Sequence, residues 1–139
     1  MAEVVTISRR ATFSSAHRLH CKEWSEEQNR QVFGKCNWGA GHGHNYTVVV
    51  SLRGPVDPRS GMVVNLTQLK ELMQPVLQLV DHRNLDEDVA FFRTRVSTAE
   101  NMAVFWWQQL RDTPVGPLLY KVKVLETENN SAVYKGELA

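Results

Sequence analysis

The stretch HGHNYTVVVSLRG, residues 42–54, decides the fold because its β-branched and aromatic residues are typical of a strand. Residues 3–20 begin with apolar residues and then alternate less cleanly, as a bent or bulged strand does. We expect these two segments to pair as a hairpin. Residues 21–41 between them are polar and contain three glycines, which predicts a long loop with one helical turn.

Two helices and a second hairpin are expected after this strand. Asn65 is a good N-cap for a helix that continues to residue 80, and Pro75 should kink or interrupt that helix. Residues 97–100 (STAE) match an S/T-x-x-E capping box, which predicts the start of the second helix. Residues 118–137 alternate in the manner of two strands joined by a turn.

The predicted order ββααββ indicates an α+β fold, a four-stranded antiparallel sheet with both helices on one face. A chain of 139 residues is expected to form one domain, residues 1–139. Such a sheet has open edges, and a chain of this length cannot close a barrel alone. Pairing of sheet edges between subunits is therefore expected, which makes the protein an oligomer.

Composition narrows the class of protein further. Hydrophobic residues make up 42% and charged residues 22% of the chain, and the formal net charge is +1, which gives no reason to expect a nucleic acid or anionic membrane as partner. No apolar run is long enough for a membrane span, and the N-terminus lacks the apolar stretch of a signal peptide. Two cysteines are too few for a disulfide framework, so we expect a reduced, cytoplasmic protein.

Histidines are the first candidates for a metal site. His42 and His44 lie two positions apart on the predicted strand and therefore point to the same face. His17 and His20 lie on the preceding segment at an odd separation, so only one of them can join that pair. Three histidines with an open position are the pattern of catalytic zinc, whereas Cys36 as a fourth ligand would make the site structural. The residues alone leave both alternatives open.

Cysteine 36 and the Asp81-His82 pair are candidates for proton transfer. Cys36 follows Lys35, which favours its thiolate, although most free cysteines are small buried residues. His82 could be no more than a cation at a helix C-terminus, where the helix dipole favours positive charge. Its neighbour Asp81 makes the two residues a possible acid–base pair.

Three glutamates have a structural and a functional interpretation each. Glu100 occupies the N3 position of the predicted capping box, which already explains its presence. Glu126 and Glu128 lie two positions apart and are expected to share a face of the second hairpin. If that face is buried, a glutamate there needs a partner, and the paired N–H donors of an amidine-like heterocycle would fit.

Six motifs, in order from about residue 8 to residue 137, together resemble the 6-pyruvoyl-tetrahydropterin synthase family. The matching segments are FSSAHRL (13–19), GKCNWGAGHGHNY (34–46), GMVVNL (61–66), VDHRNLD (80–86), STAEN (97–101) and KVLETENN (123–130). The resemblance implies the tunnelling fold, in which three four-stranded sheets form a twelve-stranded barrel and two such trimers form a homohexamer. It also implies conversion of 7,8-dihydroneopterin triphosphate to 6-pyruvoyl-tetrahydropterin and triphosphate, on the route to tetrahydrobiopterin.

The resemblance also implies roles for individual residues. By position, one zinc ion per chain falls to His17, His42 and His44, and Mg²⁺ could accompany the triphosphate. The general base corresponds to Cys36, and the proton relay to Asp81 and His82 of a different subunit. The pterin ring corresponds to a pocket formed by Glu126, Thr98 and Glu100, with Glu126 also assigned to the proton relay.

A second enzyme of the same fold, 6-carboxy-tetrahydropterin synthase, is the nearest alternative. It shares the zinc and the substrate but cleaves the side chain, and its cysteine typically stands three residues before the HGH motif. Five residues separate Cys36 from His42 here, a spacing that favours the pyruvoyl enzyme. A zinc-stabilised module without catalytic activity, closed by Cys36, is the alternative from another class.

Overall fold

A computed structural model describes all residues 1–139 and shows an α+β fold. The elements in chain order are β1 (Val4–His17), α1 (Glu26–Phe33), η1 (Gly34–Asn37), β2 (His42–Pro55), α2 (Leu66–Val80), β3 (Arg83–Asn84), α3 (Leu85–Asp88), η2 (Ala90–Arg93), α4 (Ala99–Arg111), η3 (Gly116–Leu118), β4 (Leu119–Leu125) and β5 (Ser131–Tyr134), where η denotes a 3-10 helix.

The sheet has five strands in the order β3-β1-β2-β4-β5. As predicted, β1 and β2 form a long antiparallel hairpin, in register from Val4 opposite Pro55 to His17 opposite His42. The strands β2, β4 and β5 continue the sheet with antiparallel pairing. The prediction of four antiparallel strands was wrong in one respect, because β3 adds a short parallel pairing to the outer edge of β1 at Ser15 and Ala16. That two-residue strand has no alternation from which a sequence pattern could identify it.

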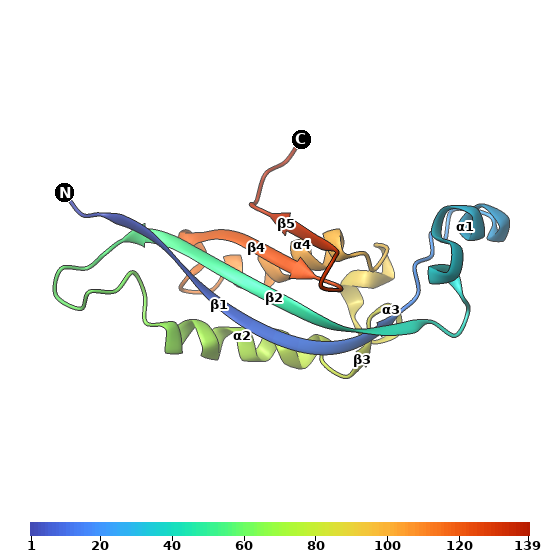
Figure 1. Cartoon of the computed structure of the whole chain (residues 1–139), viewed down its shortest axis with the longest axis horizontal. Coiled ribbons are helices and arrows are strands. Elements are labelled where there is room, and N and C mark those ends of the chain that lie inside the picture. The colour runs from blue at the N-terminus through green and yellow to red at the C-terminus, as the bar shows by residue number, and fades with distance from the viewer.

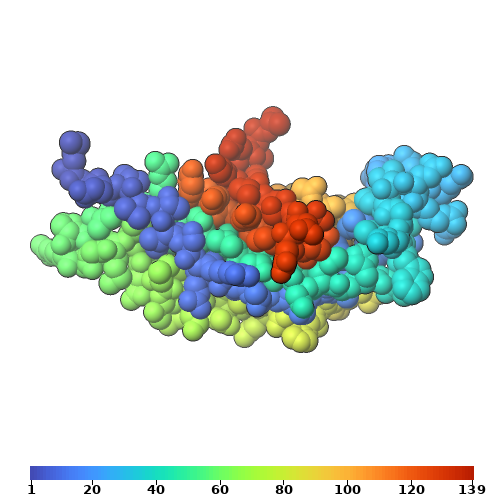
Figure 2. Space-filling model, viewed as in Figure 1, coloured from blue at the N-terminus to red at the C-terminus, as the bar shows by residue number.

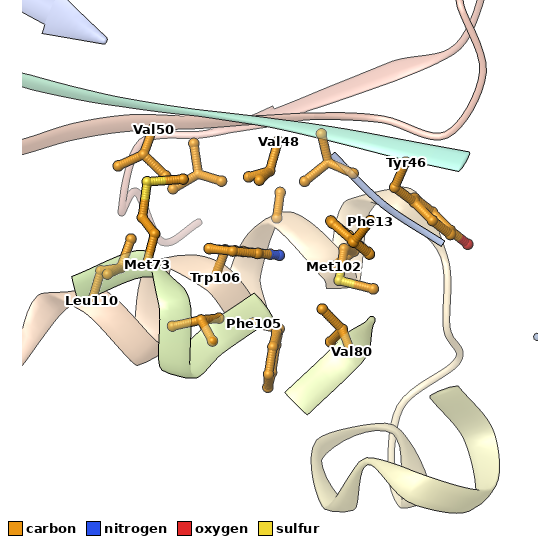
Figure 3. Packing of buried hydrophobic residues seen from close by; sticks show 14 of the residues in the cluster. Phe13, Tyr46, Val48, Val50, Met73, Val80, Met102, Phe105, Trp106 and Leu110 are labelled. Carbon is orange, nitrogen blue, oxygen red and sulfur yellow. The ribbon is translucent and has the colours of Figure 1, made fainter. Parts of the chain in front are cut away.

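Both long helices, α2 and α4, cover one face of the sheet, as Figure 1 shows. Strand β2 turns Tyr46, Val48, Val50 and Leu52 toward them, and all four are buried because strand side chains alternate between faces. Figure 3 shows Trp106 of α4 lying in this layer beneath Val48 and Val50 of the sheet. The apolar core thus runs along the length of β2 and ends near its N-terminal histidines.

The start of α2 was predicted correctly, whereas the interruption at Pro75 and the capping box at residues 97–100 were wrong. Asn65 caps α2 through its side chain, which accepts from the N–H of Thr67. The helix continues through Pro75 as one element, and Pro75 is exposed, so the carbonyl that it leaves unpaired can bind water. The N-cap of α4 is Thr98 rather than Ser97, which places Glu100 at N2 and removes the predicted capping box.

The segment between β1 and β2 is more ordered than the predicted loop. Helix α1 has eight residues and is capped by Ser25, whose hydroxyl accepts from the N–H of Gln28. A 3-10 turn, η1, follows directly and contains Cys36. Figure 2 shows this segment, in light blue, as a protrusion at one end of the molecule, opposite the N-terminus. None of the helices has the length and apolarity that crossing a membrane requires.

Candidate metal centre and its surroundings

Three histidines converge at the end of the β1–β2 hairpin where β1 ends and β2 begins. His17 and His42 are directly opposite each other in the antiparallel register, so their side chains point to the same face, and His44 lies two positions along β2 on that face. Their ring centroids are 4.7 Å (His17–His42), 5.2 Å (His17–His44) and 4.8 Å (His42–His44) apart. This row continues the core-facing residues of β2 beyond Tyr46, so the site lies at the end of the hydrophobic core.

The geometry and protonation of the histidines fit a metal ion. One nitrogen from each ring lies within 4.8 Å of the others, whereas tetrahedral zinc requires nitrogens roughly 3.4 Å apart, a difference that small rotamer changes can close. Burial lowers the pKa of both His17 and His44, which favours the neutral imidazole that a metal needs. In addition, Nε2 of His44 is buried and has no hydrogen-bond partner, as expected of an atom reserved for a ligand.

His17 is fully buried, and its ring orientation is fixed from behind. Its Nδ1 lies 2.7 Å from the backbone carbonyl oxygen of Ser97. Since a carbonyl can only accept, Nδ1 carries the proton and the lone pair of Nε2 is free to bind a metal. A hydrogen bond of this kind on the second ring nitrogen is typical of histidines that bind metals.

His20 does not join the group. Strand β1 ends at His17, and Nδ1 of His20 instead lies 3.0 Å from the side-chain amide of Asn37. The choice of His17 over His20, which the residues alone left open, therefore agrees with the structure. Cys36 also lies outside the group of mutually close ligand atoms, which consists of the three histidines. A closed site with Cys36 as fourth ligand is thus not what the structure shows.

The half-buried Cys36 is attached to the residues that follow His17. The carbonyl of Cys36 accepts from the N–H of Leu19 at 2.9 Å. The buried side chain of its neighbour Asn37 donates to the carbonyl of Leu19 at 2.7 Å, and Arg18 donates through Nε to the carbonyl of Asn37 at 2.7 Å. These bonds fix the position of η1 relative to the end of β1. A depression beside it is lined by the cationic residues Arg18, Arg30 and Lys35, together with Glu26.

Glu126 lies on the open side of the histidine group. Its carboxylate oxygens are 4.0 Å from Nε2 of His17 and 3.7 Å from Nε2 of His44, beyond hydrogen-bond distance. The side chain is 19% exposed, so it can accept from a ligand that enters the site. The expectation that Glu128 shares its face was wrong, because the strand ends at Leu125 and Glu128 lies exposed in the turn.

Asp81 and His82 form a pair, but on the outer edge of β1. Nδ1 of His82 lies 3.0 Å from Oδ1 of Asp81, and the same oxygen accepts the N–H of Ser14 at 2.9 Å. The N–H of Ser14 is the largest cause of the lowered pKa of Asp81. His82 is the one non-glycine residue with positive φ, +57°, and its side chain is 83% exposed. Neither residue belongs to the histidine group.

Thr98 and Glu100 lie at the start of α4, directly after Ser97. The hydroxyl of Thr98 accepts from the N–H of Asn101, so this residue has a structural task in the single chain. Glu100 is exposed and free of the helix-capping role expected of it. Sequence reasoning missed Ser97 as the partner of His17, because this contact joins residues far apart in the chain. It also missed Arg30, which lines the depression beside Cys36.

The fold and the three-histidine group together define an α+β protein with a candidate metal site at the end of a β-hairpin. The family model described as 6-pyruvoyl tetrahydropterin synthase matches residues 6–137, and the chain belongs to this family. Human 6-pyruvoyl tetrahydrobiopterin synthase is 55% identical over 133 residues, which cover 94% of this chain and 91% of the human protein. A putative 6-pyruvoyl tetrahydrobiopterin synthase of Caenorhabditis elegans is 52% identical and is matched over 96% of both chains.

Solved structures agree with this assignment. The structure of Caenorhabditis elegans 6-pyruvoyl tetrahydropterin synthase superimposes with a TM-score of 0.96 at 50% sequence identity, over 98% of both chains. An uncharacterized protein from Wolinella succinogenes has a TM-score of 0.73 at 19% identity, a likeness that concerns the fold alone.

Proposed function

We propose that this chain converts 7,8-dihydroneopterin triphosphate to 6-pyruvoyl-tetrahydropterin and triphosphate in tetrahydrobiopterin biosynthesis, as a zinc-dependent carbon–oxygen lyase. The observation that supports the proposal most is the family match over residues 6–137, combined with the three convergent histidines. The human relative has the name 6-pyruvoyl tetrahydrobiopterin synthase.

In this proposal His17, His42 and His44 hold one zinc ion per chain. Bound zinc would supply Lewis-acid chemistry, lowering the pKa of carbon-bound protons beside the oxygens of the substrate's side chain. Three protein ligands leave a coordination position for the substrate, as in other catalytic zinc sites. Support comes from burial, which lowers the pKa of His17 and of His44, and from the unpartnered Nε2 of His44.

Cys36 is the proposed general base, and Asp81 with His82 is the proposed proton relay. Support comes from the η1 turn, whose backbone at Cys36 and side chain at Asn37 are hydrogen-bonded to Leu19, two residues after His17. The single chain keeps Asp81 and His82 on the outer edge of β1, away from the histidine group. We therefore infer that a relay acts on the site of a second copy of the chain, so that the oligomer is needed for turnover.

Substrate recognition is assigned to Glu126, with Thr98 and Glu100 completing the pterin pocket. A half-buried carboxylate accepts two parallel N–H donors well, and the amino-pyrimidine edge of a pterin offers them. We assign the triphosphate, with or without Mg²⁺, to the depression that Arg18, Arg30 and Lys35 line. These three cations outnumber the one acidic residue there, Glu26, so the depression attracts an anion.

The proposed assembly is a homohexamer, a dimer of trimers in which three sheets form a barrel. The outer edge of β1 is paired only at its end by β3, and the outer edge of β5 is unpaired, so both edges can bind a neighbouring strand. The two cysteines are free thiols, consistent with a reducing compartment such as the cytoplasm.

The test is mass spectrometry of the products after pure protein is mixed with 7,8-dihydroneopterin triphosphate, with and without a chelator. We expect 6-pyruvoyl-tetrahydropterin and triphosphate, and loss of both products when the metal is removed. Formation of 6-carboxy-tetrahydropterin with acetaldehyde would assign the chain to the alternative synthase. No product from zinc-loaded, oligomeric protein would refute the proposed activity.

Two cysteine variants separate catalysis from metal binding. Cys36→Ala should retain one zinc per chain and lose turnover, because the base is removed and the ligands remain. Cys21→Ala is the matched control, since Cys21 is also a half-buried free thiol. Metal analysis that shows zinc lost from Cys36→Ala alone would favour a structural site instead.

A further inference from the structure

One carboxylate outside the proposed machinery contacts both segments that hold His17. Asp86 of α3 accepts the backbone N–H of Arg18 on Oδ2 at 2.7 Å, and the hydroxyl of Ser97 on Oδ1 at 2.6 Å. Arg18 directly follows His17 in the chain, and the carbonyl of Ser97 accepts from Nδ1 of His17 at 2.7 Å. The two oxygens of Asp86 thus connect the backbone beside His17 to the residue that orients its ring.

The two hydrogen bonds that Asp86 accepts, from Arg18 and from Ser97, are stronger than bonds between neutral groups. Hydrogen bonds to an ionised carboxylate are roughly twice as strong as those between neutral groups. Ser97 is only 1% exposed, so its hydroxyl needs a partner inside the protein, and Asp86 is the partner that it has. Without that carboxylate, both the hydroxyl of Ser97 and the N–H of Arg18 would lack their acceptor.

Asp86 itself is held in place by its own helix. Leu85 is fully buried in the core and anchors α3 beneath the end of β1. The side chain of Asn84 caps α3 by accepting from the N–H of Asp86 at 3.1 Å. The carboxylate therefore projects from a fixed backbone and can determine the positions of its partners.

No other hydrogen bond of the His17 ring is as short as the one to Ser97. The hydroxyl of Tyr46 lies 3.4 Å from both ring nitrogens, a long distance that selects neither of them. The carboxylate of Glu126 is 4.0 Å from Nε2 of His17, too far for a hydrogen bond. The carbonyl of Ser97 therefore makes the one short bond to the ring.

We propose that Asp86 is a positioning residue for the metal centre, which acts through Arg18 and Ser97 to direct Nε2 of His17 toward His42 and His44. The inference rests on the proposed metal site and adds a residue that does not touch the metal. Groups hydrogen-bonded directly to a metal ligand typically change metal affinity by about 10- to 100-fold when they are removed. Asp86 stands one bond further from the metal than such a group, so its effect should lie at the lower end of that range.

The test is a metal titration of the full chain, freed of metal and compared as wild type and variants. Asp86→Asn keeps the size of the side chain but replaces one acceptor oxygen with a donor, so one of its two bonds is lost. We expect the dissociation constant for Zn²⁺, measured against a competing chelator, to rise by about 10-fold, the lower end of the range for direct partners of a ligand. The visible absorption bands of the Co²⁺-loaded variant should also shift, because the orientation of one ligand changes.

Asp88→Asn is the matched control. Asp88 lies on the same helix and also accepts a backbone N–H, that of Asn84 at 2.9 Å, but it has no bond to Arg18 or Ser97. Its Zn²⁺ affinity and Co²⁺ spectrum should equal those of wild type. Thermal unfolding of the metal-free proteins then shows how far each variant is destabilised apart from metal binding.

Ser97→Ala provides a second variant if Asp86→Asn does not fold. It removes the hydroxyl while the carbonyl that accepts from His17 remains, so affinity should fall less than in Asp86→Asn, and the Co²⁺ spectrum should shift in the same direction. Wild-type affinity and spectrum in both folded variants, or equal losses in Asp86→Asn and Asp88→Asn, would overturn the proposal for Asp86. Failure of the wild-type chain to bind Zn²⁺ or Co²⁺ would instead overturn the metal site itself.

Discussion

Gly41 lies between the Cys36 turn and the metal ligands, and its replacement by alanine should disturb both. Its φ is +75°, in the left-handed region that side chains disfavour. A Cβ built at this position would lie 3.0 Å from the carbonyl oxygen of His17, tighter than ordinary van der Waals contact. An alanine at this position would therefore hold an unfavourable backbone conformation, and its methyl group would press against the backbone of the metal ligand His17.

The expected cost can be worked out from these two features. Left-handed backbone in a residue with a side chain costs about 1–2 kcal/mol, and relief of the close contact adds to it. For a chain of 139 residues, 1–2 kcal/mol corresponds to a decrease in unfolding temperature of about 3–7 °C. Since the contact can relax only by moving His17 and the start of β2 apart, metal affinity should decrease as well.

Gly39→Ala is the control for Gly41→Ala. Gly39 lies in the same loop, but a Cβ there meets no atom within 4 Å and its φ is not in the left-handed range. Thermal unfolding of the metal-free variants at one protein concentration, followed by Zn²⁺ titration, gives both quantities. Equal unfolding temperatures and equal affinities for the two variants would refute the reasoning.

Three further predictions concern the metal, the pterin and the acid–base pair. Chelation of the zinc-loaded protein should lower its unfolding temperature, because a metal at 100 times its dissociation constant stabilises the folded state by about 2.7 kcal/mol. An unchanged unfolding temperature would contradict the metal site. Glu126→Ala should weaken pterin binding by about 2–5 kcal/mol in a calorimetric titration, because buried N–H donors lose their acceptor, and an unchanged dissociation constant would remove Glu126 from the pocket. The pKa of Asp81 is lowered in the folded state, mainly by the N–H of Ser14, so its stabilisation is present above its ordinary pKa of about 3.9 and is lost as pH falls through the lower folded value. Asp81→Asn should thus reduce the free energy of unfolding at pH 7 by about 1 kcal/mol, a small value because the carboxylate is partly exposed. Equal losses at pH 7 and in strong acid would contradict this.

Strand β2 was predictable because local patterns identify it. Its β-branched and aromatic residues are typical of a strand, and the shared face of His42 and His44 follows from strand geometry. The same holds for Asn65, whose side chain caps the residues next to it. Such features depend on neighbours in the chain, so one sequence is enough to find them.

The features that were missed depend on residues far apart in the chain. Ser97 matched the first position of a capping box, but its hydroxyl donates to Asp86, and Thr98 caps the helix instead. The short strand β3 exists only because its residues lie beside β1. No periodicity marks either arrangement, since each results from tertiary contacts that local preference does not determine.

The direct opposition of His17 and His42 has a consequence for folding. A slip of β1 against β2 by a single residue would turn the imidazole of His17 to the other face of the sheet from those of His42 and His44. Misaligned hairpins would then lack a complete ligand set and gain nothing from zinc, whereas the native alignment would be stabilised in proportion to metal affinity. Binding of the ion would in this way favour one alignment of the two strands while the chain folds.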